Sequence, residues 1–282
     1  MMSRTFGIIN PGAMGISIAA SARDSGYDVI WASSGRSVDS IARAAEHTLR
    51  DVGTLEELCK QASIVVSVCP PHAAEAVADA VIAYGFDGLF VDANAISPQG
   101  TLRIGEKLDA ANIDFVDGSI IGGPAWEAGK TWLYLSGVRA GEVAACFDGG
   151  PLETSVIGSE IGKASALKMC FAAFTKGSTA LLCAIVAAAE HYQVLDDLET
   201  QWSRNGSDFA EKTEDRVRQV TSKAWRFAGE MDEISATFSA AGLPGGFHSA
   251  AGELYRRLAL FKDADDTPSL DEVLAKLLEV EE

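Results

Sequence analysis

Near the start of the chain the sequence reads Gly7-Ile8-Ile9-Asn10-Pro11-Gly12-Ala13-Met14-Gly15. This stretch joins a β-rich run, Thr5–Ile9, to an apolar segment, Ala13–Ser25, that reads as a helix ended by Gly26. A turn that binds phosphates needs a tight bend, bare backbone beside the pyrophosphate, and close contact between helix and strand. We therefore predict a phosphate-binding turn, with an ordinary strand–helix turn as the simpler alternative.

The positions inside the turn have separate tasks. Gly12 stands where bare backbone is needed, and Gly15 stands where the helix approaches the strand. Asn10 replaces the glycine that is usual at the bend, which is tolerable because Asn visits left-handed conformations more readily than most residues. The free N–H groups of the helix N-terminus favour an anion there. We expect a dinucleotide to contact Asn10, Pro11, Gly12, Ala13 and Met14.

Short β-rich runs alternate with helical stretches through the first half of the chain. After Thr5–Ile9, the runs are Tyr27–Ala32, Ser63–Cys69, Leu89–Asp92, Asp114–Asp117 and Trp132–Ser136. Ser63–Cys69 is almost continuously apolar, as in a parallel sheet that is covered on both faces. The alternation predicts an α/β fold, a Rossmann-type doubly wound parallel sheet, in residues 1–155.

The pattern becomes helical after about Pro151, and we expect an all-α domain in residues 156–282. Residues Gly162–Tyr192 read as one long helix, apolar on nearly all sides and therefore buried all round. The later helices are expected at Asp208–Gly229, Glu230–Ala241, Ser249–Phe261 and Ser269–Leu278. One small helical domain can hardly cover such a helix, so we predict a homodimer formed through this domain.

The composition restricts the partners. The chain has 23 Lys and Arg against 40 Asp and Glu, a net charge of −17, whereas nucleic acids and anionic membranes attract basic surfaces. The apolar run Leu181–Ala189 is too short to span a bilayer. Five cysteines without C-x-x-C spacing predict reduced thiols in a cytoplasmic protein, and no cluster has metal-ligand spacing. We expect a small-molecule substrate, and neither nucleic acid, membrane nor metal.

The end of the second strand indicates which dinucleotide is bound. An NAD enzyme typically has an acidic residue there to hold the ribose hydroxyls. This strand is followed instead by the small donors Ser33, Ser34 and Ser37 and by Arg36, with no Asp or Glu. An arginine at this place can grip a 2′-phosphate. We therefore predict NADP(H) as the cofactor, the alternative being a polar loop with a solvated arginine.

Several segments resemble motifs of the β-hydroxyacid dehydrogenase family, which includes 6-phosphogluconate and 3-hydroxyisobutyrate dehydrogenases. They are Asn10–Gly15, Cys69–Pro71, Asp92–Pro98, Phe115–Gly123 and Gly162–Lys168. Nearly the whole chain is similar to this family, and more so to a branch whose C-terminal domain has no known function. The resemblance implies that Cys69, Pro70 and Asn94 contact the cofactor. It also implies that Ile121, Gly122 and Gly123 form the substrate loop and that Lys168 is catalytic.

Three positions depart from the family pattern. Ile121 stands where a serine would contact a substrate carboxylate, and Ala172 stands where an asparagine follows the catalytic lysine. The lysine–aspartate pair of a later helix is Met231-Asp232 here. Polar contacts for a small hydroxy acid are therefore missing or moved. The apolar Ile121 points to a bulkier or less anionic substrate.

Lys168 lies inside a largely apolar helix, where an unpaired ammonium group is costly and its pKa falls. Such a lysine can donate a proton to a carbonyl oxygen, or remove one from an alcohol as the neutral amine. Helical spacing puts Ala172 and Thr175 on the same stripe, as further substrate contacts. The alternative is a lysine that reaches solvent from the helix edge. Roles for Lys176 and His248 stay open.

Three hypotheses for the function follow. The leading one is an NADP(H)-dependent oxidoreductase that acts on a small carbonyl or alcohol, with Lys168 as general acid and base. The second is imine reduction, whose proton donor is commonly an Asp or Tyr rather than a lysine. The third is a non-catalytic NADP(H)-binding protein, which the departures at Ile121, Ala172 and Met231 would fit and an intact Lys168 argues against.

Overall fold

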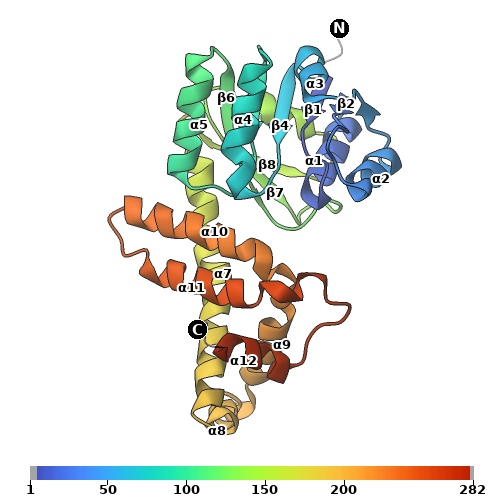
Figure 1. Cartoon of the computed structure of the whole chain (residues 1–282). Coiled ribbons are helices and arrows are strands. Elements are labelled where there is room, and N and C mark those ends of the chain that lie inside the picture. Colours follow the sequence, from blue (N-terminus) through green and yellow to red (C-terminus); the bar gives the residue numbers. More distant parts are fainter. Residues whose placement is uncertain (1–4, 280–282) are drawn as a thin grey trace. The chain divides into compact units, whose positions relative to one another are not determined.

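The computed structural model describes residues 5–279 and divides the chain into two compact units, Met1–Met169 and Cys170–Glu282. The first unit is a sheet covered by helices, and the second is entirely helical (Figure 1). The predicted order of an α/β domain followed by an all-α domain is confirmed.

The first unit contains one eight-stranded sheet with the order β3-β2-β1-β4-β5-β6-β7-β8. The strands are β1 (Thr5–Ile8), β2 (Asp28–Trp31), β3 (Arg50–Asp51), β4 (Ile64–Ser67), β5 (Leu89–Asp92), β6 (Asp114–Ile121), β7 (Trp132–Ser136) and β8 (Glu153–Gly158). The strands from β1 to β6 are parallel to one another. The predicted doubly wound parallel sheet is confirmed, with one antiparallel pairing near an edge: β7 runs antiparallel to β6, and β8 is parallel to β7.

Helices cover both faces of the sheet, as a doubly wound fold requires. They are α1 (Ala13–Asp24), α2 (Val38–Glu46), α3 (Leu55–Gln61), η1 (Pro71–Ala73), α4 (Ala74–Ala83), α5 (Pro98–Ala110), α6 (Ala140–Ala144) and η2 (Ala145–Phe147). Strand residues alternate between two buried clusters. Val66 and Val91 pack with α1 on one face, while Val65 and Phe90 pack with α3, α4 and α5 on the other.

The predicted domain boundary at residue 155 falls inside β8. Because β8 pairs with β7 from Trp132↔Glu153 to Ser136↔Gly158, the sheet continues three residues beyond that boundary. The next element, α7 (Lys163–His191), starts in the first compact unit and continues into the second. A single helix of 29 residues confirms the long helix that the sequence predicted.

The second unit is built around the rest of α7. Its other helices are α8 (Leu195–Trp202), η3 (Arg204–Gly206), α9 (Phe209–Gln219), α10 (Thr221–Ala240), α11 (Gly246–Arg257), η4 (Ala259–Asp263) and α12 (Leu270–Leu278). The predicted break between Gly229 and Glu230 is wrong, since α10 runs through both residues. The chain changes helix at Val220 instead.

Within one chain α7 is not buried all round, and the sequence prediction left the rest of its cover to a second subunit. Phe171, Phe174 and Leu181 are 47%, 75% and 46% exposed, so one side of the helix is apolar and uncovered. The helix as a whole is long and apolar enough to cross a membrane, which the shorter run Leu181–Ala189 is not. The core helix of a soluble protein can be equally long and apolar, and 44% of the most apolar 18-residue stretch of α7 is buried. Length and composition are therefore weak evidence for a membrane span.

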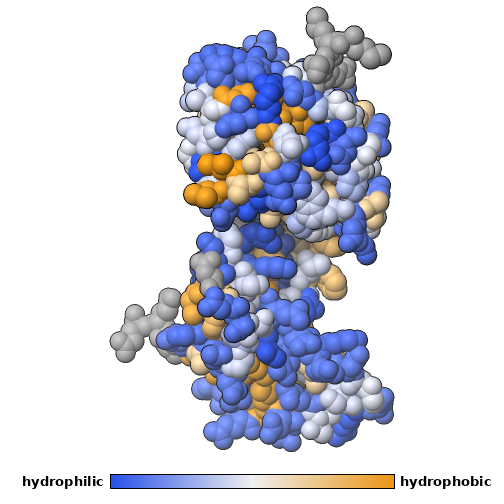
Figure 2. All heavy atoms as spheres, turned by 90° about the vertical axis from the view of Figure 1, so that its right-hand side faces the viewer, coloured by the Kyte–Doolittle hydropathy of each residue, from blue (hydrophilic) through white to orange (hydrophobic). Residues whose placement is uncertain are grey.

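The protein surface is mainly hydrophilic on the face that Figure 2 shows, with small apolar patches on both units. All five cysteines are free thiols: Cys59, Cys146 and Cys183 are buried, Cys69 is half-buried and Cys170 is exposed. Within residues 5–279, no group of three or more His, Cys, Asp or Glu side chains could hold a metal ion.

Candidate cofactor and catalytic site

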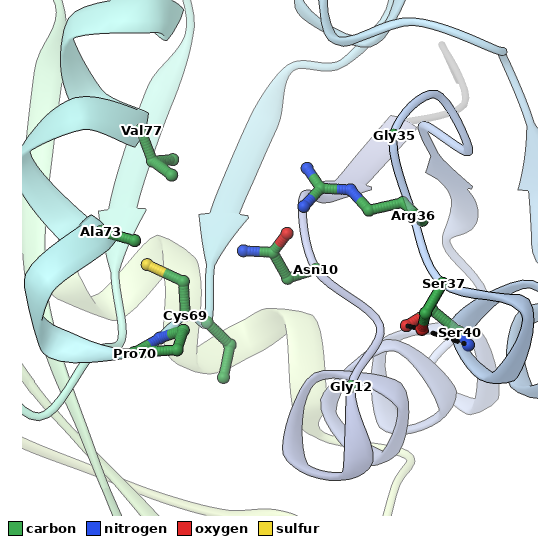
Figure 3. A pocket seen from close by; sticks show the side chains of 11 residues that line it. Asn10, Gly12, Gly35, Arg36, Ser37, Ser40, Cys69, Pro70, Ala73 and Val77 are labelled. Atoms are coloured by element: carbon green, nitrogen blue, oxygen red, sulfur yellow. Dashed lines mark hydrogen bonds between the residues drawn. The ribbon is translucent and has the colours of Figure 1, made fainter. Parts of the chain in front are cut away.

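A cavity of about 370 Å³ opens at the carboxyl ends of β1 and β4 (Figure 3). The strand order reverses between these two strands, and ligands of open α/β sheets bind at such a switch point. The cavity is lined by Asn10, Gly12, Gly35, Arg36, Ser37, Ser40, Val68, Cys69, Pro70, Ala73 and Val77. The fold therefore places the cavity where the glycine-rich turn predicted a dinucleotide.

The two glycines of the turn have different surroundings, and the close approach predicted at Gly15 is confirmed. Gly12 caps α1 in an extended conformation, and a Cβ atom added there would meet nothing within 4 Å. A Cβ at Gly15 would lie 2.0 Å from the backbone oxygen of Asn10, so only glycine lets the helix approach this closely. No carboxylate lies in the first turn of α1, so nothing there opposes an anion at the helix N-terminus.

Asn10 is present for a different reason from the predicted one. Within residues 5–279, the non-glycine residues with positive φ are Thr48, Asn112, Gln193 and Asn205, so Asn10 is not left-handed. Its side chain points into the cavity between Arg36 and Cys69 (Figure 3). Its Oδ1 atom is buried without a hydrogen-bond partner in the protein. Asn10 thus contributes a side-chain group to the site rather than a backbone conformation.

The loop between β2 and α2 forms the opposite wall. Gly35 has a φ of +73°, and the N–H of Arg36 donates to the carbonyl of Ser33 at 3.0 Å, which closes a tight turn. This turn directs the Arg36 side chain across the cavity toward Asn10 (Figure 3). The Arg36 Nε is buried without a partner in the protein. Burial also lowers the pKa of Arg36, although the group stays a cation at any ordinary pH.

Ser37 and Ser40 continue this wall. The sequence indicated Ser37 as a small donor beside Arg36, whereas Ser40 was missed. Ser37 caps α2 by accepting from the N–H of Ser40, and the two hydroxyls lie 3.1 Å apart. The sequence signal for Ser37 is its place just before a helix, because a serine there is a typical N-cap that directs its hydroxyl toward the helix start. The predicted contacts Ser33 and Ser34 do not line the cavity; their backbone N–H groups bond to Asp51 and Gly53 instead.

One carboxylate lies close to this loop, on the neighbouring strand. Asp51 accepts hydrogen bonds from the N–H groups of Ser33 and Gly53, at 3.2 Å and 2.8 Å. Burial raises the pKa of Asp51, but these hydrogen bonds outweigh it and hold the pKa below its usual value. Asp51 does not line the cavity. It shapes the turn that carries Arg36.

The third wall follows β4 and comprises Val68, Cys69 and Pro70, backed by Ala73 and Val77. Cys69 and Pro70 thus line the cavity as predicted. Burial raises the pKa of the Cys69 thiol to about 11, so it is uncharged at neutral pH. The predicted contact Asn94 is only 3% exposed and lies behind this wall. Pro11, Ala13 and Met14 are in the turn but do not line the cavity.

The start of α7 is tied to the middle of β6 by Asp117, which is 1% exposed. The Asp117 carboxylate accepts from the backbone N–H groups of Gly162, Ala164 and Ser165 at 2.9–3.1 Å, and from the hydroxyls of Ser136 and Ser165. Burial raises the pKa of Asp117, and these five hydrogen bonds oppose that shift. Gly162 has a φ of +96°, a conformation that explains the glycine six residues before Lys168.

Lys168 lies in the second turn of α7 and is half-buried. Its Nζ donates a hydrogen bond to the backbone oxygen of Ile120 at 2.7 Å. Ile120 belongs to the part of β6 that extends beyond the pairing with β5, which stops at Asp92↔Asp117. The ammonium group is therefore held on the carboxyl side of the sheet, which is also the side of the cavity.

The predicted substrate loop begins directly after this point. Ile121 is the last residue of β6, and Gly122 follows with a φ of +130°. A Cβ at Gly122 would lie 2.5 Å from the backbone oxygen of Lys130, so glycine is needed for the turn. The carbonyl of Gly123 accepts from the Thr131 hydroxyl at 2.8 Å. The loop is a well-defined turn directly after Ile120, whose carbonyl accepts the hydrogen bond from Lys168.

The remaining candidates lie in the second unit. Ala172 is fully buried, and the Thr175 hydroxyl bonds back to carbonyls of its own helix. Lys176 forms an ion pair with Glu230 at 2.7 Å, with both side chains about nine-tenths buried. His248 packs against the rings of Phe238 and Phe247 and is 6% exposed. Lys176 and His248 thus have structural contacts within the helical unit.

The cavity walls fit a dinucleotide. Asn10 and Arg36 offer buried polar atoms that the protein itself leaves unpaired. Gly12 leaves open space beside a helix N-terminus, where a pyrophosphate is favoured. Arg36 is a cation at the outer end, and Val68, Pro70 and Val77 provide apolar surface for a base.

Two sequence families match this chain. The family described as the NAD binding domain of 6-phosphogluconate dehydrogenase matches residues 5–144. A domain of unknown function, DUF1932, matches residues 189–258. The first match contains all the cavity-lining residues, and the second lies within the helical unit.

One protein of known sequence and one solved structure are similar to this chain. An uncharacterized 28.5 kDa protein of Methanothermus fervidus is 32% identical over 164 residues, covering 57% of this chain and 62% of that relative's length. The structure of MTH1747, a protein of unknown function reported as similar to 3-hydroxyacid dehydrogenases, has a TM-score of 0.65 at 25% identity, covering 92% of this chain and 100% of that one.

Two enzymes share the fold at lower identity. The 3-hydroxyisobutyrate dehydrogenase of Mycobacterium tuberculosis, solved with L-serine, has a TM-score of 0.69 at 16% identity over 99% of this chain and 100% of that one. An imine reductase of Myxococcus stipitatus in complex with NADP+ has a TM-score of 0.54 at 17% identity over 98% and 100%.

The fold, the cavity and the two family matches define a hydroxyacid dehydrogenase-like oxidoreductase that binds a nicotinamide dinucleotide. Residues 5–144 belong to the family of 6-phosphogluconate dehydrogenase NAD-binding domains, and residues 189–258 belong to DUF1932. The predicted resemblance to these dehydrogenases, with a C-terminal domain of unknown function, is confirmed at this level.

Proposed function

We propose that the protein is an NADP(H)-dependent oxidoreductase that interconverts a small carbonyl compound and its alcohol, with Lys168 as general acid and base. The observation that carries the proposal is the position of Lys168. Its Nζ is held by the Ile120 carbonyl at 2.7 Å, on the carboxyl side of the sheet where the cofactor cavity opens. A fixed ammonium group at this edge suits proton transfer to a reacting oxygen.

The preference for NADP(H) over NAD(H) rests on the loop after β2. Arg36, Ser37 and Ser40 line the cavity there, and the Nε of Arg36 is unpaired. The nearby carboxylate of Asp51 is bonded to backbone N–H groups outside the cavity. A cation with two hydroxyls suits a 2′-phosphate, whereas the ribose hydroxyls of NAD(H) are usually held by a carboxylate.

The bound nicotinamide would supply or accept a hydride at the substrate carbon. In the reducing direction, the Lys168 ammonium group donates a hydrogen bond and then a proton to the carbonyl oxygen. In the oxidising direction, the neutral amine removes the proton of the alcohol. The Ile120 carbonyl keeps Nζ in place in both directions, because it accepts from the amine as well as from the ammonium group.

The substrate is expected to be less anionic than a small hydroxy acid. Ile121 occupies the loop position where the family has a serine, so an apolar side chain meets the substrate there. We further propose a soluble, cytoplasmic homodimer. The uncovered apolar side of α7, with Phe171, Phe174 and Leu181, supports a contact through the helical unit.

The test compares Lys168→Met with a control variant, Lys163→Met. Lys163 is an exposed lysine on the same helix, and its side chain pairs with Glu160 at 2.7 Å. NADPH absorbance is followed with a panel of aldehydes, ketones and 3-oxo acids. We expect Lys168→Met to lose about 10²–10⁴-fold in turnover while it binds NADPH with unchanged affinity. Lys163→Met keeps the wild-type rate. Full activity of Lys168→Met would refute the role of this lysine.

The likeness of the fold to an imine reductase makes imine reduction the second candidate. Cyclic imines belong in the same panel for that reason. Turnover of imines alone would select this reaction. Tight NADPH binding without turnover of any carbonyl, alcohol or imine would indicate a non-catalytic NADP(H)-binding protein.

A further inference from the structure

The side-chain amide of Asn94 is engaged by groups of the protein itself. Its Oδ1 accepts from the backbone N–H of Cys69 at 2.5 Å, and its Nδ2 donates to Ser67 Oγ at 3.2 Å and to Asp92 Oδ2 at 2.8 Å. These bonds use both amide hydrogens and the amide oxygen. The residue is also 3% exposed. Asn94 therefore faces the interior of the protein, between the ends of β4 and β5.

The bond to Cys69 has a clear task in the loop after β4. Two prolines, Pro70 and Pro71, follow Cys69 in the sequence. Proline has no N–H, so Cys69 offers the last backbone donor before His72 by which this loop can be anchored. Val68, Cys69 and Pro70 are the loop residues that line the cavity. Fixing the backbone at Cys69 therefore fixes one wall of the cavity.

Asp92 sets the direction of the Asn94 amide. Its two carboxylate oxygens accept from the backbone N–H of Asn94 at 2.9 Å and from Nδ2 at 2.8 Å. Burial raises the pKa of Asp92 to about 7. When Asp92 is ionised, the reversed amide would put oxygen against a carboxylate, so the amide oxygen points toward Cys69. Asp92 is 1% exposed and is the register partner of Asp117 on β6. Asp92 and Asn94 thus form a rigid unit under the loop.

We propose that Asn94, oriented by Asp92, is a positioning residue that shapes the cofactor cavity through the backbone of Cys69 and does not itself contact the cofactor. The inference rests on the proposed binding of NADPH in this cavity. It differs from the direct contact that the sequence suggested for Asn94. Asn10 provides the contrast, because its side chain points into the same cavity with an unpaired oxygen.

Two measurements separate positioning from contact. The first is NADPH affinity by titration calorimetry. The second, made without cofactor, is the rate at which N-ethylmaleimide modifies Cys69, followed by peptide mass spectrometry to distinguish the five cysteines. Cys69 is half-buried, and burial raises the pKa of its thiol to about 11, so the wild-type rate is expected to be slow.

We expect Asn94→Ala to weaken NADPH binding about tenfold and to speed Cys69 modification about tenfold, because the buried N–H of Cys69 loses its acceptor. Asn10→Ala should weaken NADPH binding and leave the Cys69 rate at the wild-type value. If Asn94→Ala does not fold, Asp92→Asn tests the same unit, since it replaces one of the two acceptors with a donor. That variant should change both quantities in the same direction.

Weaker NADPH binding by Asn94→Ala at an unchanged Cys69 rate would overturn the proposal in favour of direct contact. Wild-type values of both quantities would overturn it as well. If the wild-type protein fails to bind NADPH, the proposed function fails, while the Cys69 rates still decide whether Asn94 holds the loop. The two failures are therefore distinguishable.

Discussion

Ser165 donates two hydrogen bonds to Asp117, from its backbone N–H at 3.1 Å and from its hydroxyl at 2.7 Å. Ser165 is in the first turn of α7 and Asp117 is on β6, so the bonds join helix to sheet. Lys168 follows one turn later and bonds to Ile120, three residues after Asp117. The catalytic candidate is thus carried on a helix whose start is fixed to the strand that also holds its Nζ.

The Asp117 carboxylate should therefore be important for stability. Asp117→Asn keeps the shape but brings an NH2 group into a site where five donors already converge. We expect the free energy of unfolding to fall by about 3 kcal/mol, as for other broken buried charge contacts. Urea unfolding followed by circular dichroism measures this change.

Asp114→Asn is the matched control on the same strand. Asp114 pairs with Arg139, but its side chain is 62% exposed. An exposed pair contributes little, so the loss should stay below about 1 kcal/mol. Equal losses in the two variants would show that Asp117 does not anchor α7.

Arg36 should determine the choice between the two nicotinamide dinucleotides. Arg36→Ala removes the cation that lines the cavity beside Ser37 and Ser40. We expect NADPH affinity to fall about 10–100-fold, the effect of losing charge-assisted hydrogen bonds, and NADH affinity to change little. Titration calorimetry with both cofactors measures the two changes.

The control for Arg36 is Arg50→Ala. Arg50 lies on the neighbouring strand β3 and pairs with Asp28 at 2.7 Å, outside the cavity. It should leave both affinities unchanged. A parallel loss of NADPH and NADH affinity in Arg36→Ala would contradict a 2′-phosphate contact.

The features predictable from sequence are those with a local cause. Gly12 and Gly15 are recognised by their spacing after a strand; the structure confirms the close approach at Gly15 and leaves open space at Gly12. Apolar runs predicted six of the eight strands, because burial on two faces leaves a clear pattern. The strands β3 and β8 were missed because they contain no buried residue and leave no such pattern. The long helix α7 was visible because neither proline nor turn residues interrupt it.

The features that escaped prediction depend on partners far away in sequence. Asn94 is turned inward by contacts with Ser67 and Cys69, more than 20 residues earlier. Asp117 meets Ser165 across 48 residues. The direction of β7 was also hidden, since an apolar run does not show whether its partner is parallel. The uncovered side of α7 could not be seen because composition does not tell which side a neighbouring helix covers.

The uncovered side of α7 makes the oligomeric state testable. Phe174 is 75% exposed on this helix, and an aromatic side chain in that position is typical of a subunit contact. We expect the wild-type protein to have twice its chain mass of 29.7 kDa in light scattering at micromolar concentration. Phe174→Glu should give the mass of one chain, because a buried carboxylate without a partner is unfavourable.

Trp126→Glu is the control for the dimer, since it also adds a charge at an exposed aromatic residue, here 48% exposed in the first unit. It should leave the mass of the dimer unchanged. A wild-type mass of one chain would exclude a dimer under these conditions.

His248 should make the helical unit sensitive to acid. Its ring packs on Phe238 and Phe247, Nδ1 has no partner, and burial lowers its pKa below 6.5. The unfolded chain therefore binds this proton at a higher pH than the folded chain. Stability contributed by neutral His248 is present above about pH 6.5 and is lost as the pH falls toward the folded pKa.

The measurement is the free energy of unfolding of wild type and His248→Phe between pH 5 and 8. The difference between them should grow in favour of His248→Phe as the pH falls through 6.5. His72→Gln, at an exposed histidine, should follow the wild-type curve. Parallel curves for His248→Phe and wild type would show that His248 takes up its proton equally in both states.

Gly12 and Gly15 should separate cofactor binding from folding. A Cβ at Gly12 meets nothing within 4 Å, and its φ of −70° suits any residue, so Gly12→Ala should fold with nearly unchanged stability. The added methyl group would occupy the space beside the helix N-terminus where the pyrophosphate is expected, so NADPH binding should be lost. At Gly15 the Cβ would lie 2.0 Å from the Asn10 oxygen, so Gly15→Ala must push the helix away and should lose about 1–3 kcal/mol of stability. Unfolding curves and NADPH titrations of both variants decide this, and NADPH binding by Gly12→Ala at wild-type affinity would place the phosphates elsewhere.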